Sequence, residues 1–283
     1  MFRQIIFIKF VFNKFLFVKI ALISFLIGFS SCNVEKKAAK SFIESKDKPA
    51  LYVTFSDNWK LFLLRSRVVG KEQKYDTAFF QYDEVKSQNY KIYLADSLFK
   101  KSLKEELASD GFKAFKNEEI GNFFSSSDDK FIVEFLQMYI EEKPVPVRDT
   151  FYFSPDNFIK FDTSISSVEV LFWIRVNPVN NLNLASPLLF ASFSLTDFFD
   201  GEWKYNFETD SYYYQYEFLP YNTEDLYAFF DYTGLNLASY FYDYFMNLHL
   251  HNSLKSPPKA YYSFNKKTNV LRKAGYNRFI FME

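Results

Sequence analysis

Residues 222–250 read NTEDLYAFFDYTGLNLASYFYDYFMNLHL, and this stretch decides the second half of the fold. Asn222 is a good helix N-cap, and the two acidic residues that follow Thr223 complement the positive end of a helix dipole. Hydrophobic residues then recur at helical spacing from Leu226 to Leu248, which predicts a long helix with a wide apolar face. We expect Gly234 to kink or split this helix, and its apolar face to pack on a sheet.

The strands that this helix would cover come directly before it. Residues 188–199, 202–207 and 212–218 are rich in aromatic and β-branched residues. Asp200-Gly201 between two aromatic runs is a two-residue hairpin signal, and residues 208–211 favour a second turn. The sequence therefore predicts a three-stranded antiparallel meander over residues 188–218.

Three tyrosines alternate along the last of these strands. Tyr212, Tyr214 and Tyr216 would lie on one face, because successive side chains of a strand point to opposite sides. Two interpretations remain open for this face. It either packs beneath the helix at 222–250, or it is exposed and stacks on sugars or binds another protein.

The first half of the chain has a different pattern. Residues 50–55 and 131–140 read as buried strands, and residues 94–110 form an amphipathic helix that Gly111 would end. Prolines at 144 and 146 suggest a boundary. We therefore expect an α+β protein, with a small α/β domain at 50–145 followed by a domain at 146–283 in which an antiparallel sheet packs on the long helix.

The N-terminus carries an export signal. Basic residues up to Lys19 precede an apolar run of about a dozen residues, too short to cross a bilayer that needs about 20. A permanently spanning helix, extended back to Ile5, is the alternative, and it would bury three lysines. Ser30-Ser31 then precede Cys32, which is the single cysteine of the chain.

This arrangement resembles a bacterial lipoprotein signal with its lipobox, although Phe29 stands where the family has an aliphatic residue. The resemblance implies that residues 1–31 are removed and that Cys32 is acylated. The polar and charged residues that follow, 32–49, indicate a tether with a short helix around 38–43. The chain as a whole resembles envelope lipoproteins of Bacteroidota, and residues 50–142 are similar in pattern to the small α/β domain of envelope-associated lipoproteins. The expected location is the outer membrane, facing the periplasm.

Composition limits the possible functions. Residues 32–283 contain 30 basic and 34 acidic residues, and no run of basic residues predicts a nucleic-acid partner. With 7 glycines, the chain has no glycine-rich phosphate loop, and no cofactor is expected. His249 and His251 are the only histidines; their spacing on a helix separates them, so we expect a solvated helix end and not a metal site.

The expected function is that of a non-catalytic accessory or scaffold subunit, held at the membrane by its lipid and docked to other envelope proteins. A glycan- or lipid-binding module that uses the tyrosine face is the first alternative. A hydrolase is the second, with carboxylate pairs at Asp128-Asp129 or Glu141-Glu142 as candidate groups. No catalytic residue is assigned.

Overall fold

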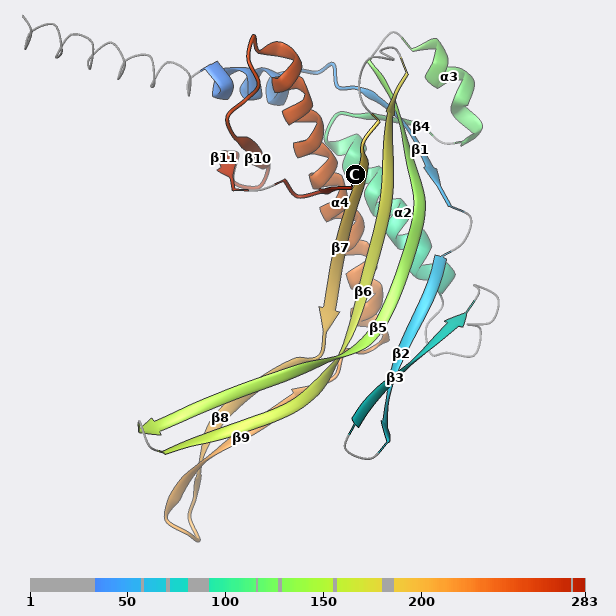
Figure 1. The fold of residues 1–283 in the computed structure, drawn as a ribbon. Helices are drawn as coiled ribbons and strands as arrows, with labels where there is room; N and C mark the ends of the chain where they lie inside the picture. The colour runs from blue at the N-terminus through green and yellow to red at the C-terminus, as the bar shows by residue number, and fades with distance from the viewer. Residues whose placement is uncertain are drawn as a thin grey trace, which may run out of the picture. The chain divides into compact units, whose positions relative to one another are not determined.

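Figure 1 shows the computed structural model of the chain, which describes residues 34–56, 59–69, 72–80, 92–115, 117–126, 129–154, 157–179, 186–275 and 277–282. The fold is α+β, as the sequence predicts. A large mixed sheet is combined with several helices, and the longest of those described is α4 (Thr223–Ser253).

The centre of the sheet is a long antiparallel pair, β5 (Lys130–Ser154) and β6 (Asn157–Pro178). Along its other edge β5 pairs in parallel with β1 (Ala50–Phe55) and, further on, with β2 (Trp59–Val69). Two shorter strands therefore share one long neighbour. The outer strands are β3 (Glu72–Phe80) beside β2, β4 (Lys113–Phe115) beside β1, β7 (Leu188–Thr196) beside β6, and β12 (Ile280–Met282) beside β7.

β5 runs without a break through Pro144 and Pro146, where the sequence suggested a domain boundary. Among the described strands, only β6 pairs with this part of β5, because the pairing with β2 ends at Glu142. A proline lacks the amide that a second neighbouring strand would need, so it is tolerated where a strand has one neighbour. Residues 150–153 continue β5 beyond these prolines.

The compact units of the structure divide the chain elsewhere. The larger unit comprises Asp47–Tyr242 and Arg278–Glu283, and the smaller comprises Met1–Lys46 and Asp243–Asn277. The expected boundary between residues 145 and 146 lies inside the larger unit, because strands from both expected domains belong to one sheet.

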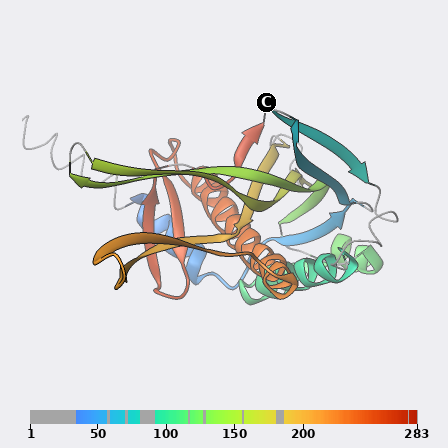
Figure 2. The same ribbon diagram turned by 90° about the horizontal axis from the view of Figure 1, so that it is seen from below.

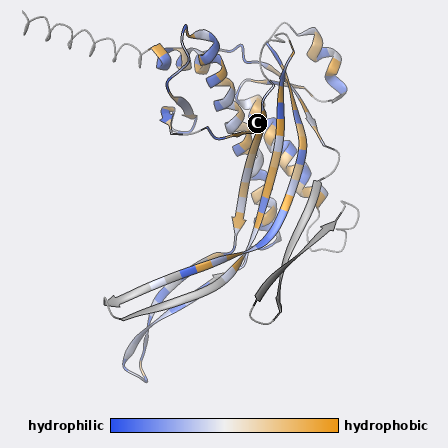
Figure 3. Cartoon of the chain, viewed as in Figure 1, coloured by the Kyte–Doolittle hydropathy of each residue, from blue (hydrophilic) through white to orange (hydrophobic). Residues whose placement is uncertain are grey.

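The core of the larger unit lies between one face of the sheet and two helices, α2 (Ile92–Ser109) and the first part of α4 (Figures 1 and 2). Phe99 of α2 stacks on Phe172 of β6, with 5.0 Å between ring centroids. Phe241 of α4 lies edge-on to Phe135 of β5 at 6.4 Å. Hydrophobic residues, orange in Figure 3, accordingly follow the central strands that these helices cover.

The opposite face of β1 is covered by a shorter helix. η2 (Asn117–Glu119) leads into α3 (Ile120–Ser125), whose buried Phe123 lies 5.5 Å from Tyr52 of β1. Tyr52 can reach α3 because its neighbours along the strand point to the other face, toward α2.

The smaller unit contains a helical segment at residues 34–44, the second part of α4, and the hairpin of β10 (Tyr261–Asn265) and β11 (Val270–Ala274). Within the tether expected at 32–49, residues 34–44 are helical, a longer span than the short helix predicted around 38–43. Ala39 and Phe42 of this segment are buried, and the Phe42 ring lies 5.6 Å from that of His249 on α4. These apolar contacts fix the segment to its unit.

The meander expected at 188–218 is only partly correct. β8 (Phe198–Asn206) and β9 (Ser211–Leu219) form a hairpin, and its turn at residues 207–210 lies where the second turn was expected. Asp200-Gly201, however, lies inside β8 and pairs with Glu217 and Tyr216, so the predicted two-residue turn is wrong. The chain instead leaves the large sheet at Asp197, between β7 and β8.

Candidate functional site: an exposed aromatic hairpin

The β8–β9 hairpin carries a ladder of aromatic rings on one face. Tyr212, Tyr214 and Tyr216 occupy alternate positions of β9, as the sequence predicts. Opposite them on β8 stand Trp203, which pairs with Tyr214, and Tyr205, which pairs with Tyr212. The ring centroids of these cross-strand pairs lie 5.3 Å and 4.9 Å apart. The ladder is therefore a set of contacting rings and not three isolated tyrosines.

Much of this ladder is open to solvent. Tyr212 is 70% exposed and Trp203 is 39% exposed, and Phe207 in the turn is 89% exposed. Among the strands that the structure describes, β8 and β9 pair only with each other, as a separate two-stranded sheet. Of the two interpretations left open by the sequence, burial beneath α4 does not fit the exposure of Tyr212.

Tyr214 is held in place by Gly201, which lies diagonally across the hairpin from it because Gly201 pairs with Tyr216. Its ring lies against Gly201, where a Cβ atom would be only 2.3 Å from the ring, and its hydroxyl donates a hydrogen bond to the Gly201 carbonyl oxygen at 2.9 Å. A tyrosine that covers a cross-strand glycine pins the register of a hairpin. The Asp200-Gly201 pair, which the sequence predicted as a turn, therefore contains the glycine on which the Tyr214 ring packs.

The hairpin is also acidic. Residues 198–219 contain five carboxylates and a single lysine, Lys204, which pairs with Glu202 at 2.8 Å. That carboxylate raises the pKa of Lys204. The Tyr205 hydroxyl donates to the Asp210 carboxylate beside the turn, which raises the pKa of the phenol. Exposed rings are therefore surrounded by negative charge.

Sequence reasoning singled out the β9 tyrosines and missed Trp203, Tyr205 and Phe207. The signal was present, because aromatic and polar residues alternate from Glu202 to Phe207. What the sequence does not contain is the register that places each β8 ring opposite a β9 ring.

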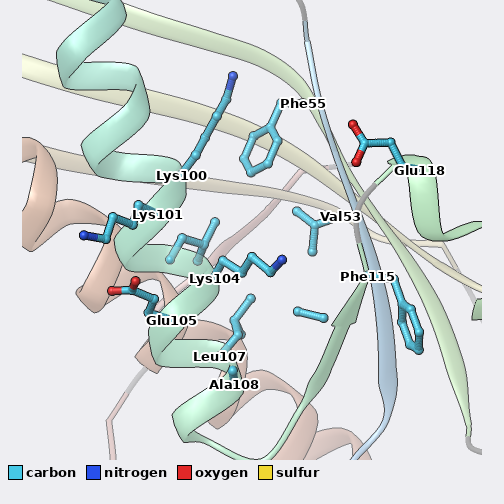
Figure 4. Close-up of a pocket in the computed structure, with 12 residues that line it drawn as sticks. Val53, Phe55, Lys100, Lys101, Lys104, Glu105, Leu107, Ala108, Phe115 and Glu118 are labelled. Atoms are coloured by element: carbon cyan, nitrogen blue, oxygen red, sulfur yellow. The ribbon is translucent and has the colours of Figure 1, made fainter.

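A second candidate site is a pocket of about 660 Å³ between α2, β1 and β4 (Figure 4). Val53 and Phe55 of β1 supply part of its apolar wall, and Leu103 and Leu107 of α2 supply another part. Its volume and lining are typical of small-molecule sites, which are mostly apolar with a few polar groups.

Three lysines of α2 line this pocket. Lys104 points from the helix toward β1, whereas Lys101 points away from the strands (Figure 4). Lys100 donates to Asp96 at 2.8 Å and lies 5.0 Å from the centre of the Phe55 ring. An apolar pocket with an ammonium group directed into it suits a ligand that is apolar at one end and anionic at the other.

The carboxylates proposed for hydrolysis are arranged differently from the expectation. Asp128 lies outside the described residues. Glu141 and Glu142 are adjacent on β5, so their side chains point to opposite faces of the strand. Glu141 instead faces Glu169 across the β5–β6 ladder, with Lys143 bonded to both. The Glu169 carboxylate raises the pKa of Lys143, which is consistent with an ion-pair cluster.

The histidines lie near the end of α4. His249 is within 3.5 Å of the Ser41 hydroxyl and 3.3 Å of the Ser253 hydroxyl, whereas His251 is exposed. Within the part of the chain that the structure describes, no three His, Cys, Asp or Glu side chains gather into a set that could hold a metal ion.

Cys32, the predicted acylation site, lies outside the described residues, as does the whole signal at 1–31. In the residues that are described, no helix has the length and hydrophobicity needed to span a bilayer. Comparisons with protein-family models, with curated proteins and with solved structures return no significant match. The function is therefore inferred from this chain's own residues and their arrangement.

Proposed function

We propose that this chain is a lipid-anchored, non-catalytic accessory subunit of the cell envelope, and that the aromatic face of its β8–β9 hairpin docks onto another envelope protein. The lipid anchor is inferred from the signal that ends at Cys32. The docking role is inferred from the structure of the hairpin, and its exposed ladder of rings is the observation on which this proposal depends most.

Two physical properties favour a protein partner. Tryptophan and tyrosine are enriched at protein interfaces, where their large rings bury much apolar area. A two-stranded hairpin is only marginally stable in water by itself, so contact with a partner would stabilise it. The β8–β9 hairpin carries such rings, and it is a two-stranded sheet of this kind.

The orientation of the rings disfavours the glycan alternative. Neighbouring rings are steeply inclined to each other, by 71° for Trp203 and Tyr214 and by 77° for Tyr214 and Tyr216. A sugar ring stacks on a flat aromatic platform, whereas inclined rings leave gaps that partner side chains can fill. The ladder therefore suits interdigitation with a protein better than stacking on a glycan.

The docking role is tested with two variants of similar chemistry. Tyr212→Ser removes an exposed ring from the ladder, and Tyr232→Ser removes a 60% exposed ring from α4. Affinity purification from detergent-solubilised membranes, followed by mass spectrometry, should show a partner that Tyr212→Ser loses and Tyr232→Ser retains. Purification of the monomer alone, or equal loss in both variants, would contradict the docking role.

The lipid anchor has its own test. Cys32→Ser should abolish metabolic acyl labelling and leave a larger, unprocessed precursor, because the cysteine is the only acyl acceptor that the signal offers. Acyl labelling that persists in this variant would show that the anchor is not at Cys32.

The pocket beside α2 favours a second candidate function, the binding of a single-chain anionic amphiphile. The acyl chain would lie against Val53 and Leu107, and the anionic head would lie at Lys104. Titration with sodium dodecanoate tests this role. Lys104→Met should weaken binding by about tenfold or more, the usual cost of losing a charge-assisted hydrogen bond. Lys113→Met, at an exposed lysine of β4 outside the pocket lining, should not change it. Equal affinity in the two variants would exclude the pocket.

A further inference from the structure

The charges of the chain are divided unequally between its two compact units. The described part of the smaller unit, residues 34–46, 243–275 and 277, has a net charge of +7, although residues 32–283 as a whole have −4. Its cations are ten in number: Lys36, Lys37, Lys40, Lys46, Lys255, Lys259, Lys266, Lys267, Arg272 and Lys273. All ten of these residues are exposed.

Most of the carboxylates in this part of the unit are buried. Glu35 is buried and accepts hydrogen bonds from the Lys259 amide at 3.0 Å and the Tyr262 hydroxyl at 2.8 Å. Asp243 is buried and accepts from the Phe264 amide at 2.9 Å. Among residues 34–46, 243–275 and 277, Glu44 is the one acidic residue left exposed. The surface is therefore even more basic than the net charge indicates.

The lysines near the N-terminus lie on the outer side of an amphipathic segment. Glu35, Ala39 and Phe42 are buried at the i, i+4 and i+7 positions of the helical segment. Lys36, Lys37 and Lys40 take the intervening positions and remain exposed. Further cations lie around the β10–β11 turn, where Lys266 and Lys267 are both exposed.

We propose that the smaller unit binds an anionic lipid surface through these exposed cations. Clustered lysines and arginines are attracted to anionic headgroups, and each contributes additively within about one Debye length. The closeness of this unit to Cys32 in the chain favours a membrane over other polyanions, and this step rests on the proposed lipid anchor. Glu35 is fixed three residues after Cys32, so the chain can separate the two by no more than about 11 Å.

This surface would supply the second of two membrane signals. Besides acyl chains, electrostatic attraction to anionic headgroups contributes to membrane attachment, and a basic surface supplies it. The electrostatic binding itself requires no acyl group. It therefore goes beyond the proposed lipid anchor, and it can be measured on a chain that is not acylated.

The experiment uses residues 32–283 with Cys32→Ser, which retains both units, and vesicles of phosphatidylcholine with or without phosphatidylglycerol. Co-sedimentation should occur with the anionic vesicles and weaken as salt is added. A triple variant, Lys36→Gln, Lys40→Gln and Lys267→Gln, should bind at least about tenfold more weakly. Glutamine has a helix propensity close to that of lysine, and unchanged urea midpoints confirm that the fold is intact.

A matched control removes three exposed cations from the larger unit, with Lys113→Gln, Arg148→Gln and Arg175→Gln. It should bind anionic vesicles as the parent does. The proposal would be overturned if the control and the triple variant lost the same amount of vesicle binding. It would also be overturned if the parent bound neutral vesicles as well as anionic ones, or did not sediment with vesicles at all. Tighter binding of an RNA duplex through the same lysines would also overturn it. If this chain binds anionic vesicles but Cys32 is not acylated in cells, the proposed lipid anchor is refuted and the electrostatic membrane surface is supported.

Discussion

Gly234 of α4 lies against the Phe99 carbonyl oxygen of α2, so closely that a Cβ atom at residue 234 would be 2.5 Å from that oxygen. The same Cβ would lie 2.8 Å from the Leu103 amide nitrogen. Beside this contact, the Ser102 hydroxyl bonds to the Asp231 carboxylate. The glycine therefore does not split α4, which is continuous from Thr223 to Ser253. It allows two helices to approach at their backbones.

Gly234→Ala should therefore destabilise the protein, although alanine is the better helix former. The added methyl group forces apart two backbones that cannot move independently, and overpacking of this kind costs about 1–3 kcal/mol. A lower urea midpoint in circular dichroism would show the effect. Gly121→Ala in α3 is the control, since no atom lies within 4 Å of its added Cβ. A midpoint for Gly234→Ala at or above that of the parent would contradict the close approach.

The start of α4 depends on a reciprocal pair of side chains. Asn222 Oδ1 accepts hydrogen bonds from the amides of Glu224 at 2.7 Å and Asp225 at 3.0 Å, and Asp225 Oδ2 accepts from the Asn222 amide at 2.9 Å. Asn222→Ala should reduce the free energy of unfolding by about 0.5–2 kcal/mol, the usual loss for an N-cap. Asn222→Ser should restore most of it. Equal losses for alanine and serine would mean that the side-chain cap does not contribute.

Local signals predicted the helices well. The apolar stripe of α2, the glycine after it and the cap of α4 are all contained in short stretches of sequence. Gly111 has the positive φ of 86° that a helix-ending glycine adopts, so the end of α2 could be predicted from one residue.

The strands were harder to predict because distant contacts decide them. Asp197 accepts hydrogen bonds from the amides of Ser166 on β6, at 2.8 Å, and of Tyr221 before α4, at 3.1 Å. These contacts mark the point where the chain leaves the large sheet, and they join segments more than 20 residues apart. Asp200-Gly201 gave the stronger local turn signal, yet tertiary structure overrides it.

The candidate site was predicted in the same partial way. Alternation alone places Tyr212, Tyr214 and Tyr216 on one face, whereas Trp203 joins them only through the β8–β9 register. The basic surface of the smaller unit was missed for a related reason. Its cations come from two segments about 200 residues apart in sequence, and neither contains a long basic run.

Lys48 should make the stability of the larger unit depend on alkaline pH. Burial lowers the pKa of this amine to about 8, and the nearby Asp110 carboxylate raises it only in part. The unfolded chain holds the same proton up to its ordinary value of 10.5. Between these pH values the unfolded state binds more protons, so the free energy of unfolding should rise with pH from about 8 to 10.5.

The measurement compares urea midpoints of the parent and Lys48→Met over this alkaline range. Methionine keeps the apolar stem, so the pH-dependent rise should disappear while the packing beside Tyr242 is retained. Lys46→Met, an exposed lysine two residues earlier, should leave the rise unchanged. A Lys48→Met variant with the parent's slope would assign the pH dependence to other groups.

Glu35 should make the smaller unit sensitive to acid. Burial raises the pKa of this carboxyl, but the hydrogen bonds from the Lys259 amide and the Tyr262 hydroxyl, together with nearby lysines, outweigh it and hold the pKa below its ordinary value of 4.5. A carboxyl with a depressed folded pKa stabilises the fold fully above its unfolded pKa. This contribution is lost as pH falls from 4.5 through the lower folded value.

Glu35→Gln should therefore lower the free energy of unfolding by about 1–3 kcal/mol at neutral pH, because it weakens hydrogen bonds to a charged group. The difference from the parent should shrink as the pH falls below 4.5, since the parent then loses the same contribution. Urea unfolding of both proteins at pH values from neutral down to 3 measures this difference. Glu44→Gln, on the exposed side of the same helical segment, is the matched control. A difference that is constant with pH would show that Glu35 acts through packing and not through its charge.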